Sequence, residues 1–202
     1  MAEYFYADRL FNALERVEPG PGMLLISAPG MLSTDFARTV VLVLEHEADH
    51  TIGVVLNHRS ELAVFNVMAD WAELVAPPQA LYIGGPVSPQ SAIAVGVTKN
   101  GVDIDSHPRF TRLANRLVHV DLDADPATLG DDVDGLRIFA GYAAWQEGQL
   151  DEEILRGDWY VAPALPTDVI APAGADLWGD VMRRQPMPLP LFATFPANLE
   201  DN

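Results

Sequence analysis

The sequence predicts an α+β fold in which a mixed, largely antiparallel sheet packs against a few helices. Segments of strand character outnumber segments of helix character, and short loops join many neighbouring strands, as they do in antiparallel sheets. The 202 residues suit one domain spanning 1–202, because a chain of this length can bury a single sizeable core. Hydrophobic residues make up 49% and charged residues 20%, which is the balance of a folded globular chain.

The strands are expected in apolar, β-branched runs. The segment "GMLLISAPG" predicts a first buried strand, and "TVVLVLE" (39–45) and "TIGVVLN" (51–57) predict the next two. Only residues 46–50 separate the second and third runs, which is the length of a hairpin loop. Further strands are expected in "ALYIGGPV", "SAIAVGVT", "RLVHVDLD", "LRIFAGYAAW" and "WYVAPA", with a helical turn from Asp125.

Four helices are expected from apolar spacing and end signals. An amphipathic helix within residues 1–18 precedes Pro19, and a buried helix over "ELAVFNVMADWAEL" (61–74) stops at Pro77-Pro78. "GQLDEEILRG" has acidic residues in its first turn and a glycine where a helix ends, and "DLWGDVMRRQP" has two arginines in its last turn. The proline-rich tail, residues 185–202, is expected to lie extended on the domain.

Composition excludes several classes of function. The chain has no cysteine, so it has no disulfide, thiolate nucleophile or cysteine metal site. A net charge of −17 opposes binding to DNA or RNA, since phosphates attract cations. The one basic row, Arg109, Arg112 and Arg116, has helical spacing, and a solvated helix face is the simpler interpretation than an anion or RNA site.

We expect a cytoplasmic protein that does not cross a membrane. The first residues lack the basic and apolar regions of a signal peptide, and no apolar run approaches the roughly 20 residues that a membrane helix needs. Nucleotide-binding glycine motifs and the G-x-S-x-G elbow of hydrolases are absent from the sequence. No cofactor is predicted.

Residues 46–50, "HEADH", match the zinc-protease pattern H-E-x-x-H. That chemistry requires a helix that places both histidines on one face, whereas strand-like runs flank this segment on both sides. A hairpin connection is therefore favoured over a metal site.

Two other stretches imitate binding loops. "DLDADPATLGDD" carries aspartates at calcium-loop spacing, but Pro126 occupies the place that needs glycine, so we predict a solvated acidic turn. "GGPVSPQS" could form a backbone nest for an anion, but a strand-ending turn at Gly84 and Gly85 is the simpler interpretation.

"GYAAWQEGQLDEE" is the most unusual stretch. Alternation after Phe139 would place Gly141, Ala143 and Trp145 on one face and Tyr142 on the other. Aromatic rings beside glycine and Gln149 could line a pocket, or could pack the corner between a strand and a helix.

Several stretches, taken in order, resemble the bacterial AlgH/YqgE family. The matching pieces are "GMLLISAPGMLSTDFARTVVLVLEH", "GVVLN", "GGPV", "GYAAWQEGQLDEEI" and "GDWYVAPA", so the family core covers about residues 22–178. The resemblance implies a compact single-domain α+β protein with a strongly curved, barrel-like sheet. Family members are usually labelled transcriptional regulators, and no biochemical activity is firmly assigned to them.

The family motifs carry over to a set of named positions. They fall on Pro29, Asp35, Phe36, Arg38, His46, Asn57, Gly84, Gly85, Pro86, Gly141, Tyr142, Trp145, Gly148, Gln149 and Trp159. Of these, the candidate ligand or partner pocket comprises Arg38, His46, Asn57, Gly84, Gly85, Tyr142, Trp145 and Gln149. Where the family usually continues Asn-Arg-Pro, this chain has Asn57-His58-Arg59-Ser60, which puts any role of that proline turn in doubt.

Three hypotheses of function follow. The first is a non-enzymatic regulatory or adaptor protein that acts through a protein partner or a small ligand. The second is an enzyme of unrecognised class, in which Arg38 binds an anionic substrate and His46 acts as general acid or base. The third is direct nucleic-acid binding, which the charge disfavours.

Overall fold

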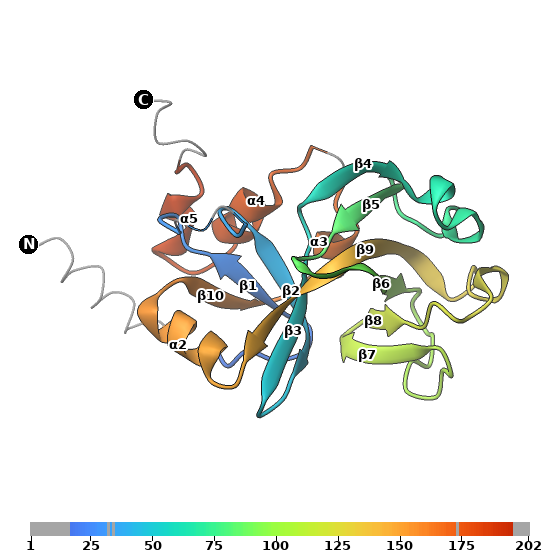
Figure 1. Ribbon diagram of the computed structural model, residues 1–202, viewed down its shortest axis with the longest axis horizontal. Coiled ribbons are helices and arrows are strands. Elements are labelled where there is room, and N and C mark those ends of the chain that lie inside the picture. The colour runs from blue at the N-terminus through green and yellow to red at the C-terminus, as the bar shows by residue number, and fades with distance from the viewer. Residues whose placement is uncertain (1–16, 32, 34, 173, 196–202) are drawn as a thin grey trace, which may run out of the picture.

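Ten strands in the described part of the chain, residues 17–31, 33, 35–172 and 174–195 of the computed structural model, form one curved sheet (Figure 1). The strands are β1 (Met23–Ser27), β2 (Val40–His46), β3 (His50–Val55), β4 (Arg59–Ala63), β5 (Ala80–Ile83), β6 (Val87–Thr98), β7 (Phe110–Ala114), β8 (Leu117–Val120), β9 (Val133–Gln146) and β10 (Trp159–Pro163). The helices are α2 (Gln149–Arg156), α3 (Pro166–Val169), α4 (Leu177–Arg183) and α5 (Leu189–Phe192), with 3-10 turns η1 (Val64–Asn66), η2 (Ala69–Trp71) and η3 (Pro126–Thr128).

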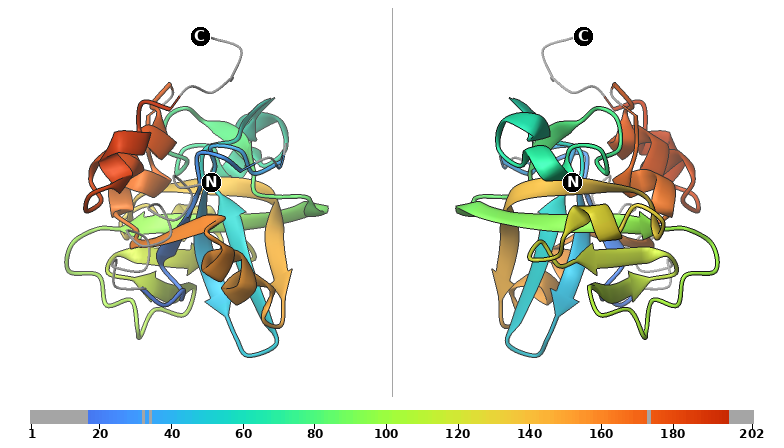
Figure 2. Two further views of the ribbon diagram at one scale, coloured as in Figure 1. Left: turned by 90° about the vertical axis from the view of Figure 1, so that its left-hand side faces the viewer. Right: turned by 90° about the vertical axis from the view of Figure 1, so that its right-hand side faces the viewer.

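The sheet is mixed and largely antiparallel, as the sequence predicts. Its strand order is β10-β1-β2-β3-β9-β6-β8-β7, and each neighbouring pair along that path is antiparallel. β5 runs parallel to β9, and β4 pairs with β5. The two side views show that the sheet curls (Figure 2), so the predicted fold class is confirmed.

The first three strands are buried on both faces. Leu24 and Ile26 belong to a core that α4 and α5 cover, whereas Leu25 belongs to a second core on the opposite face, beneath α2. A strand that is covered on both sides needs apolar residues at every position rather than at alternate ones. This requirement explains the uninterrupted run "VVLVL". A third core fills the space between β6, β8, β9 and the 3-10 turns.

The long strand β9 joins the two halves of the sheet. Its first part pairs with β6, and its last four residues pair with β3. Between these parts lies Gly141 at φ +68°, a left-handed conformation that resets the alternation of side chains. Phe139 and Tyr142 therefore contact the same core, and Ala143 and Trp145 enter the opposite one. The predicted opposition of Tyr142 to Ala143 and Trp145 is confirmed.

Arg137 is a charged residue inside the fold, with only 1% of its surface exposed. Its guanidinium and Nε donate to four backbone carbonyl oxygens, those of Ala76, Pro78, Val169 and Ala171, at 2.9–3.3 Å. The guanidinium also lies 4.4 Å from the centre of a tyrosine ring, that of Tyr82. Arg137 thus ties two loops, one before β5 and one after α3, to the central strand. Burial lowers its pKa from the ordinary value.

The buried helix predicted over residues 61–74 is wrong. The segment forms the end of β4 and the turns η1 and η2. Val64 and Trp71 are buried, as the apolar pattern requires, but Leu62, Phe65 and Val67 are exposed. Pairing of β4 with β5 supplies backbone hydrogen bonds to the start of the segment, so tertiary context overrides its helical spacing.

The helical interpretation of Arg109 to Arg116 is also wrong. The segment is the hairpin of β7 and β8, which pairs Phe110 with Val120. Asn115 has φ +49°, a conformation that asparagine tolerates in tight hairpin turns. Arginines three and four residues apart therefore straddle a turn instead of lining a helix.

The tail is only partly as predicted. Instead of lying extended, it forms α5 and buries Leu189 and Ala193 against the main core. Proline suits the first turn of a helix, where its missing N–H costs nothing, and Pro190 takes such a place.

Other predicted elements are confirmed. The two runs around "HEADH" are β2 and β3, "GQLDEEILRG" is α2, "DLWGDVMRRQP" contains α4, and the turn after Asp125 is η3. The helix expected within residues 1–18 falls outside the described residues, except for Val17 and Glu18, which belong to no helix or strand. None of the helices in the described part of the chain is long and apolar enough to cross a membrane.

Candidate functional site

The candidate residues fall into two groups at different places on the sheet. The first group lies near the start of β2, the ends of β3 and β5, and the β9 residues that cross them. It comprises Arg38, Asn57, Gly84, Gly85 and Tyr142. The other group, His46, Trp145 and Gln149, lies where the β2–β3 hairpin meets the end of β9 and the start of α2.

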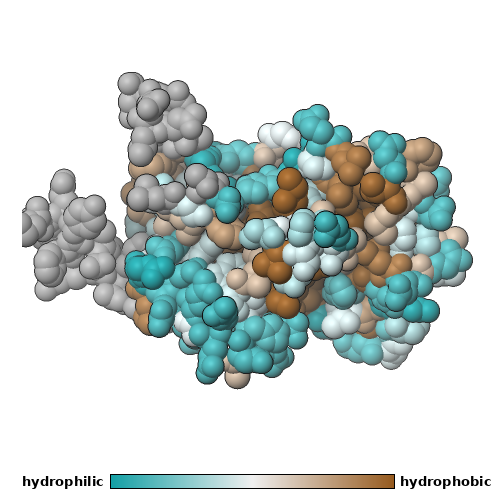
Figure 3. All heavy atoms as spheres, viewed as in Figure 1, coloured by the Kyte–Doolittle hydropathy of each residue, from teal (hydrophilic) through white to brown (hydrophobic). Residues whose placement is uncertain are grey.

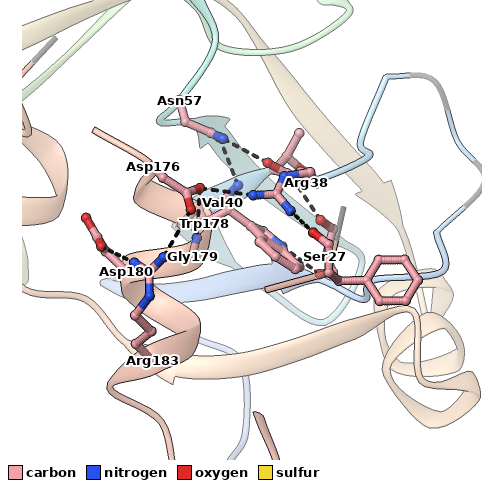
Figure 4. A network of polar contacts seen from close by, with 11 residues as sticks. Ser27, Arg38, Val40, Asn57, Asp176, Trp178, Gly179, Asp180 and Arg183 are labelled. Carbon is pink, nitrogen blue, oxygen red and sulfur yellow. Dashed lines mark hydrogen bonds and ion pairs between the residues drawn. The ribbon is translucent and has the colours of Figure 1, made fainter. Parts of the chain in front are cut away.

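Arg38 is held by contacts on several sides (Figure 4). Its Nη1 donates to the carbonyl of Phe195 at 2.7 Å, and its Nη2 lies 3.2 Å from Oδ1 of Asp176. The guanidinium carbon lies 4.2 Å from the centre of the Trp178 ring. This is a cation–π contact, in which the face of the aromatic ring attracts the positive charge. Asp176 balances the charge of Arg38, so the arginine links the sheet to the α4–α5 region.

The backbone of Arg38 is also fixed. Its φ of +52° is a left-handed conformation, which is unusual for a side chain of this size. Asn57 stabilises this turn, because its amide nitrogen donates to the Arg38 carbonyl at 2.8 Å and its oxygen accepts from the Val40 N–H at 3.0 Å. Ser27 contributes next to it by accepting from the Thr39 N–H at 2.9 Å. The carried-over asparagine therefore has a positioning role in this structure.

Gly84 and Gly85 lie at a close crossing of two backbones. A Cβ on Gly84 would lie 2.3 Å from the carbonyl oxygen of Gly141, and one on Gly85 would lie 2.2 Å from the carbonyl carbon of Tyr142. Since no side chain fits at such distances, both positions require glycine. The Gly84 N–H donates to Ala140, and its carbonyl accepts from Val55. This finding supports the strand-turn interpretation of "GGPV".

A cavity of about 240 Å³ lies beside His46. Its lining comes from the tip of the β2–β3 hairpin and from the connection between β9 and α2, namely His46, Glu47, Ala48, His50, Thr51, Gln146, Glu147, Gly148, Leu150 and Asp151. His46 Nδ1 lies 2.8 Å from the hydroxyl of Thr51. The His50 ring lies beside the carboxylates of Asp49 and Glu45. Both raise its pKa, and the largest cause is the hydrogen bond that the ring donates to Asp49. Among the described residues, no group of three or more metal-ligating side chains could hold a metal ion.

Trp145 and Gln149 converge on a residue that the sequence did not single out. The indole N–H groups of Trp145 and Trp159 both donate to Oε2 of Glu153 at 2.8 Å, and the Gln149 amide donates to its Oε1 at 3.0 Å. The Phe36 ring packs on both indoles, with centroid distances of 5.6 and 6.3 Å. These contacts fasten α2 to the sheet, which supports the interpretation of this stretch as a packed corner.

His46 does not face Arg38 and Asn57 across a shared cavity. Arg38 precedes β2, whereas His46 ends it, and six residue steps of a strand span roughly 20 Å. The cavity beside His46 includes neither Arg38 nor Asn57 in its lining. An active site that combines Arg38 as anion binder with His46 as general base is therefore not assembled in this structure.

The three arginines of the β7–β8 hairpin are each paired with an aspartate. Arg109 contacts Asp121 at 2.7 Å, Arg112 contacts Asp105 at 2.7 Å, and Arg116 contacts Asp134 at 2.6 Å. Because each positive charge already has a carboxylate beside it, the row offers little free charge to a phosphate backbone.

Sequence reasoning missed a surface formed by exposed apolar side chains. We define the β4–β5 apolar surface as Leu62, Phe65, Val67 and Ile83, whose exposed fractions are 39%, 67%, 52% and 49%. In the space-filling view, hydrophobic residues gather on the side of the molecule where β4 and β5 lie, whereas the side around α2 and the β2–β3 hairpin is mostly hydrophilic (Figure 3). Three of the four residues, Leu62, Phe65 and Val67, belong to the segment 61–74, for which the sequence predicts a buried helix.

Comparisons with known proteins identify the family. A family model described as AlgH-like, DUF179, matches residues 24–190. A UPF0301 protein of Corynebacterium efficiens is 62% identical over 198 residues, which is 98% of each chain. The crystal structure of protein DIP2367 from Corynebacterium diphtheriae superposes with a TM-score of 0.91 at 60% identity, over 94% of this chain and 100% of that one. The solution structure of AlgH from Pseudomonas aeruginosa has a TM-score of 0.63 at 24% identity, over 90% and 97% of the chains, and shares the fold. The resemblance inferred from the motifs is confirmed, and the chain belongs to the AlgH-like family.

Proposed function

We propose that this protein is a non-enzymatic regulatory or adaptor protein of the cytoplasm that acts by binding a protein partner. The observation that carries this proposal is the β4–β5 apolar surface. Single exposed apolar residues are ordinary on soluble proteins, but Phe65 and Val67 are more than half exposed and lie close together in sequence with Leu62. Grouped exposure of this kind marks surfaces that a partner covers.

The polar residues carried over from the family support the same proposal. Arg38, Asn57 and Gln149 use their hydrogen-bonding groups on carbonyls, N–H groups and side chains of the protein itself. The glycines at 84 and 85 allow two strands to cross. Such roles keep a scaffold rigid, and a rigid scaffold presents a docking surface without a large entropic cost on binding.

A regulatory role would then be exercised through another protein. Direct contact with DNA is opposed by the net charge of −17 and by the aspartates beside Arg109, Arg112 and Arg116. The label of transcriptional regulator that the family resemblance brings is compatible with an indirect role of this kind.

Affinity capture from cells of the source organism tests the proposal. The wild-type chain is compared with a Phe65→Ser/Val67→Ser variant, and with Leu155→Ser as a matched control, because Leu155 on α2 is 61% exposed and lies away from β4 (Figure 1). We expect a defined partner that the wild type and the control retain and the double variant loses, with binding reproduced by the two purified proteins. If the wild type, the double variant and the Leu155→Ser control capture the same set of proteins, the proposal is refuted.

A small-ligand site is the second candidate, and the cavity beside His46 favours it. A thermal-shift screen of metabolites on the wild type and on His46→Ala checks this alternative. A compound that stabilises only the wild type would support it, and a screen in which every compound acts equally on both chains would oppose it.

A further inference from the structure

Acidic residues are the only charged residues in the segment that carries the β4–β5 apolar surface. Between residues 60 and 98 the chain has three acidic residues, Glu61, Asp70 and Glu73, and no lysine or arginine. All three lie in β4 or in the turns that follow it, and all three are exposed. Arg59, at the start of β4, is the nearest cation in the sequence.

These three carboxylates are available to a partner, as are other carboxylates of this acidic chain. Among the described residues, Glu61, Asp70 and Glu73 form no ion pair, whereas seven aspartates elsewhere pair with arginines: Asp105, Asp121, Asp134, Asp158, Asp168, Asp176 and Asp180. An exposed apolar surface bordered by unpaired carboxylates is complementary to an apolar surface bordered by cations.

The edge of β4 is a poor template for an added strand. Four residue steps of β4, from Arg59 to Ala63, span the same length as two steps of β5, so the strand bulges between Arg59 and Ala63. The Ser60 hydroxyl donates to the Leu81 carbonyl at 2.8 Å and accepts from the Leu62 N–H at 3.2 Å. A short, bulged edge of this kind resists pairing with another chain. The surface therefore binds through its side chains.

Charge opposes the binding of a second copy of this chain to the surface. In a two-fold dimer the same patch meets itself, so the segment 60–98 would bring two sets of the same carboxylates, and no lysine or arginine, into one interface. Each chain also carries a net charge of −17, which adds long-range repulsion.

We propose that the β4–β5 apolar surface binds an amphipathic helix of a partner protein, whose apolar stripe is flanked by lysine or arginine. An apolar stripe at helical spacing covers Leu62, Phe65, Val67 and Ile83, and the flanking cations pair with Glu61, Asp70 and Glu73. This inference rests on the proposed adaptor function and specifies the chemistry of the partner.

Synthetic helical peptides on the full-length protein test it. One 18-residue probe carries a leucine stripe flanked by lysines, a second has glutamates in place of the lysines, and a third has a central proline that breaks the helix. We expect only the first to bind, with NMR shifts confined to amides of residues 59–73 and 80–84. Phe65→Ser should weaken binding at least about tenfold, as loss of a central aromatic anchor does, and Leu155→Ser should leave it unchanged.

The charge component is tested separately. A Glu61→Gln/Asp70→Asn/Glu73→Gln variant should bind the lysine probe several-fold more weakly and lose most of the salt dependence between about 50 and 300 mM, because screening acts on the charges removed. Equal binding of the glutamate or proline probes, or NMR shifts elsewhere, would overturn the helix proposal. If a cellular partner is lost with the Phe65→Ser/Val67→Ser variant while the lysine probe does not bind, the adaptor function stands and this inference falls. If that variant retains every partner, both fall.

Discussion

Replacement of Arg137 by methionine should strongly destabilise the protein. The side chain is 1% exposed and donates to four backbone carbonyls. A buried acceptor that loses its partner costs about 1–3 kcal/mol, so four acceptors set an upper limit near 12 kcal/mol. Three effects make the actual loss smaller. Methionine fills a similar volume, it removes the buried charge, and it leaves room for water that can bind the carbonyls. We therefore expect a net loss of about 3–5 kcal/mol, well below that upper limit.

The measurement is urea unfolding followed by circular dichroism, together with calorimetry. For a chain of about 200 residues each kcal/mol corresponds to about 2–4 °C, so the melting temperature should fall by about 6–20 °C. The melting temperature of Arg137→Lys should lie between those of the wild type and Arg137→Met, because an ammonium group keeps the charge but cannot reach four divergent carbonyls. Arg156→Met is the matched control: its side chain is 62% exposed and contacts Asp158, and the variant should unfold at nearly the same urea concentration and temperature as the wild type. If Arg137→Met unfolds within about 1 kcal/mol of the wild type, the reasoning is refuted.

Three further predictions concern pH and two contacts. Burial lowers the pKa of His58 and of His119 below the ordinary 6.5, so the unfolded chain binds their protons first, and stability should fall as pH drops from about 7.5 through 6.5 and level off below the folded pKa values. Replacing both histidines by glutamine should flatten this part of a stability–pH curve; an unchanged slope would contradict the assignment. Gly141→Ala should cost about 2–5 kcal/mol in urea unfolding, since it adds a strained left-handed residue to a close strand crossing; a loss below about 1 kcal/mol would show that the crossing can relax. Glu153→Ala should cost about 1–3 kcal/mol by stranding two indole N–H groups and should shift tryptophan emission, unlike the exposed neighbour Glu152→Ala.

The strands that could be predicted are those whose own residues dictate them. The run "VVLVL" is β-branched and apolar throughout, and only a strand covered on both faces satisfies it. The helix α2 was predictable because Gly157 takes φ +87° at its end and acidic residues occupy its first turn. In both cases the local preference and the tertiary environment agree.

The segment over 61–74 could not be predicted correctly, because a count of apolar residues does not reveal which of them find a partner. Phe65 is 67% exposed, although its place in the pattern implied a core position. The Arg109 to Arg116 spacing fits a helix and a hairpin equally well, and the left-handed Asn115 decides between them. The turn preference of a single asparagine thus determines the structure of a segment whose periodicity is ambiguous.

The candidate residues could be found from their motifs, but their grouping could not. Arg38 and His46 lie eight positions apart in the sequence, and the strand between them carries them to opposite ends of β2. The partners that define their roles come from distant parts of the chain: Asp176 contacts Arg38 across 138 positions, and no local pattern announces it. Glu153 is close in sequence to Trp145 and Trp159, but nothing in the sequence distinguishes it from an exposed acidic residue on the surface of a helix.

The pairing of β9 with both β3 and β6 affects how this chain folds during synthesis and where it can be engineered. Because one strand completes both sides of the sheet, the β6 side cannot close before residues 133–142 are synthesised, and the β3 side cannot close before residues 143–146 follow. The pairing of β1 with β10 joins residues as far apart as Met23 and Pro163, so folding waits for nearly the whole chain, and contacts of such long range slow it. Fragments that end before β9 would expose unpaired edges prone to aggregation. A reporter or tag is therefore better inserted at a hairpin tip, such as the loop between β2 and β3, than at any cut that divides the chain in two.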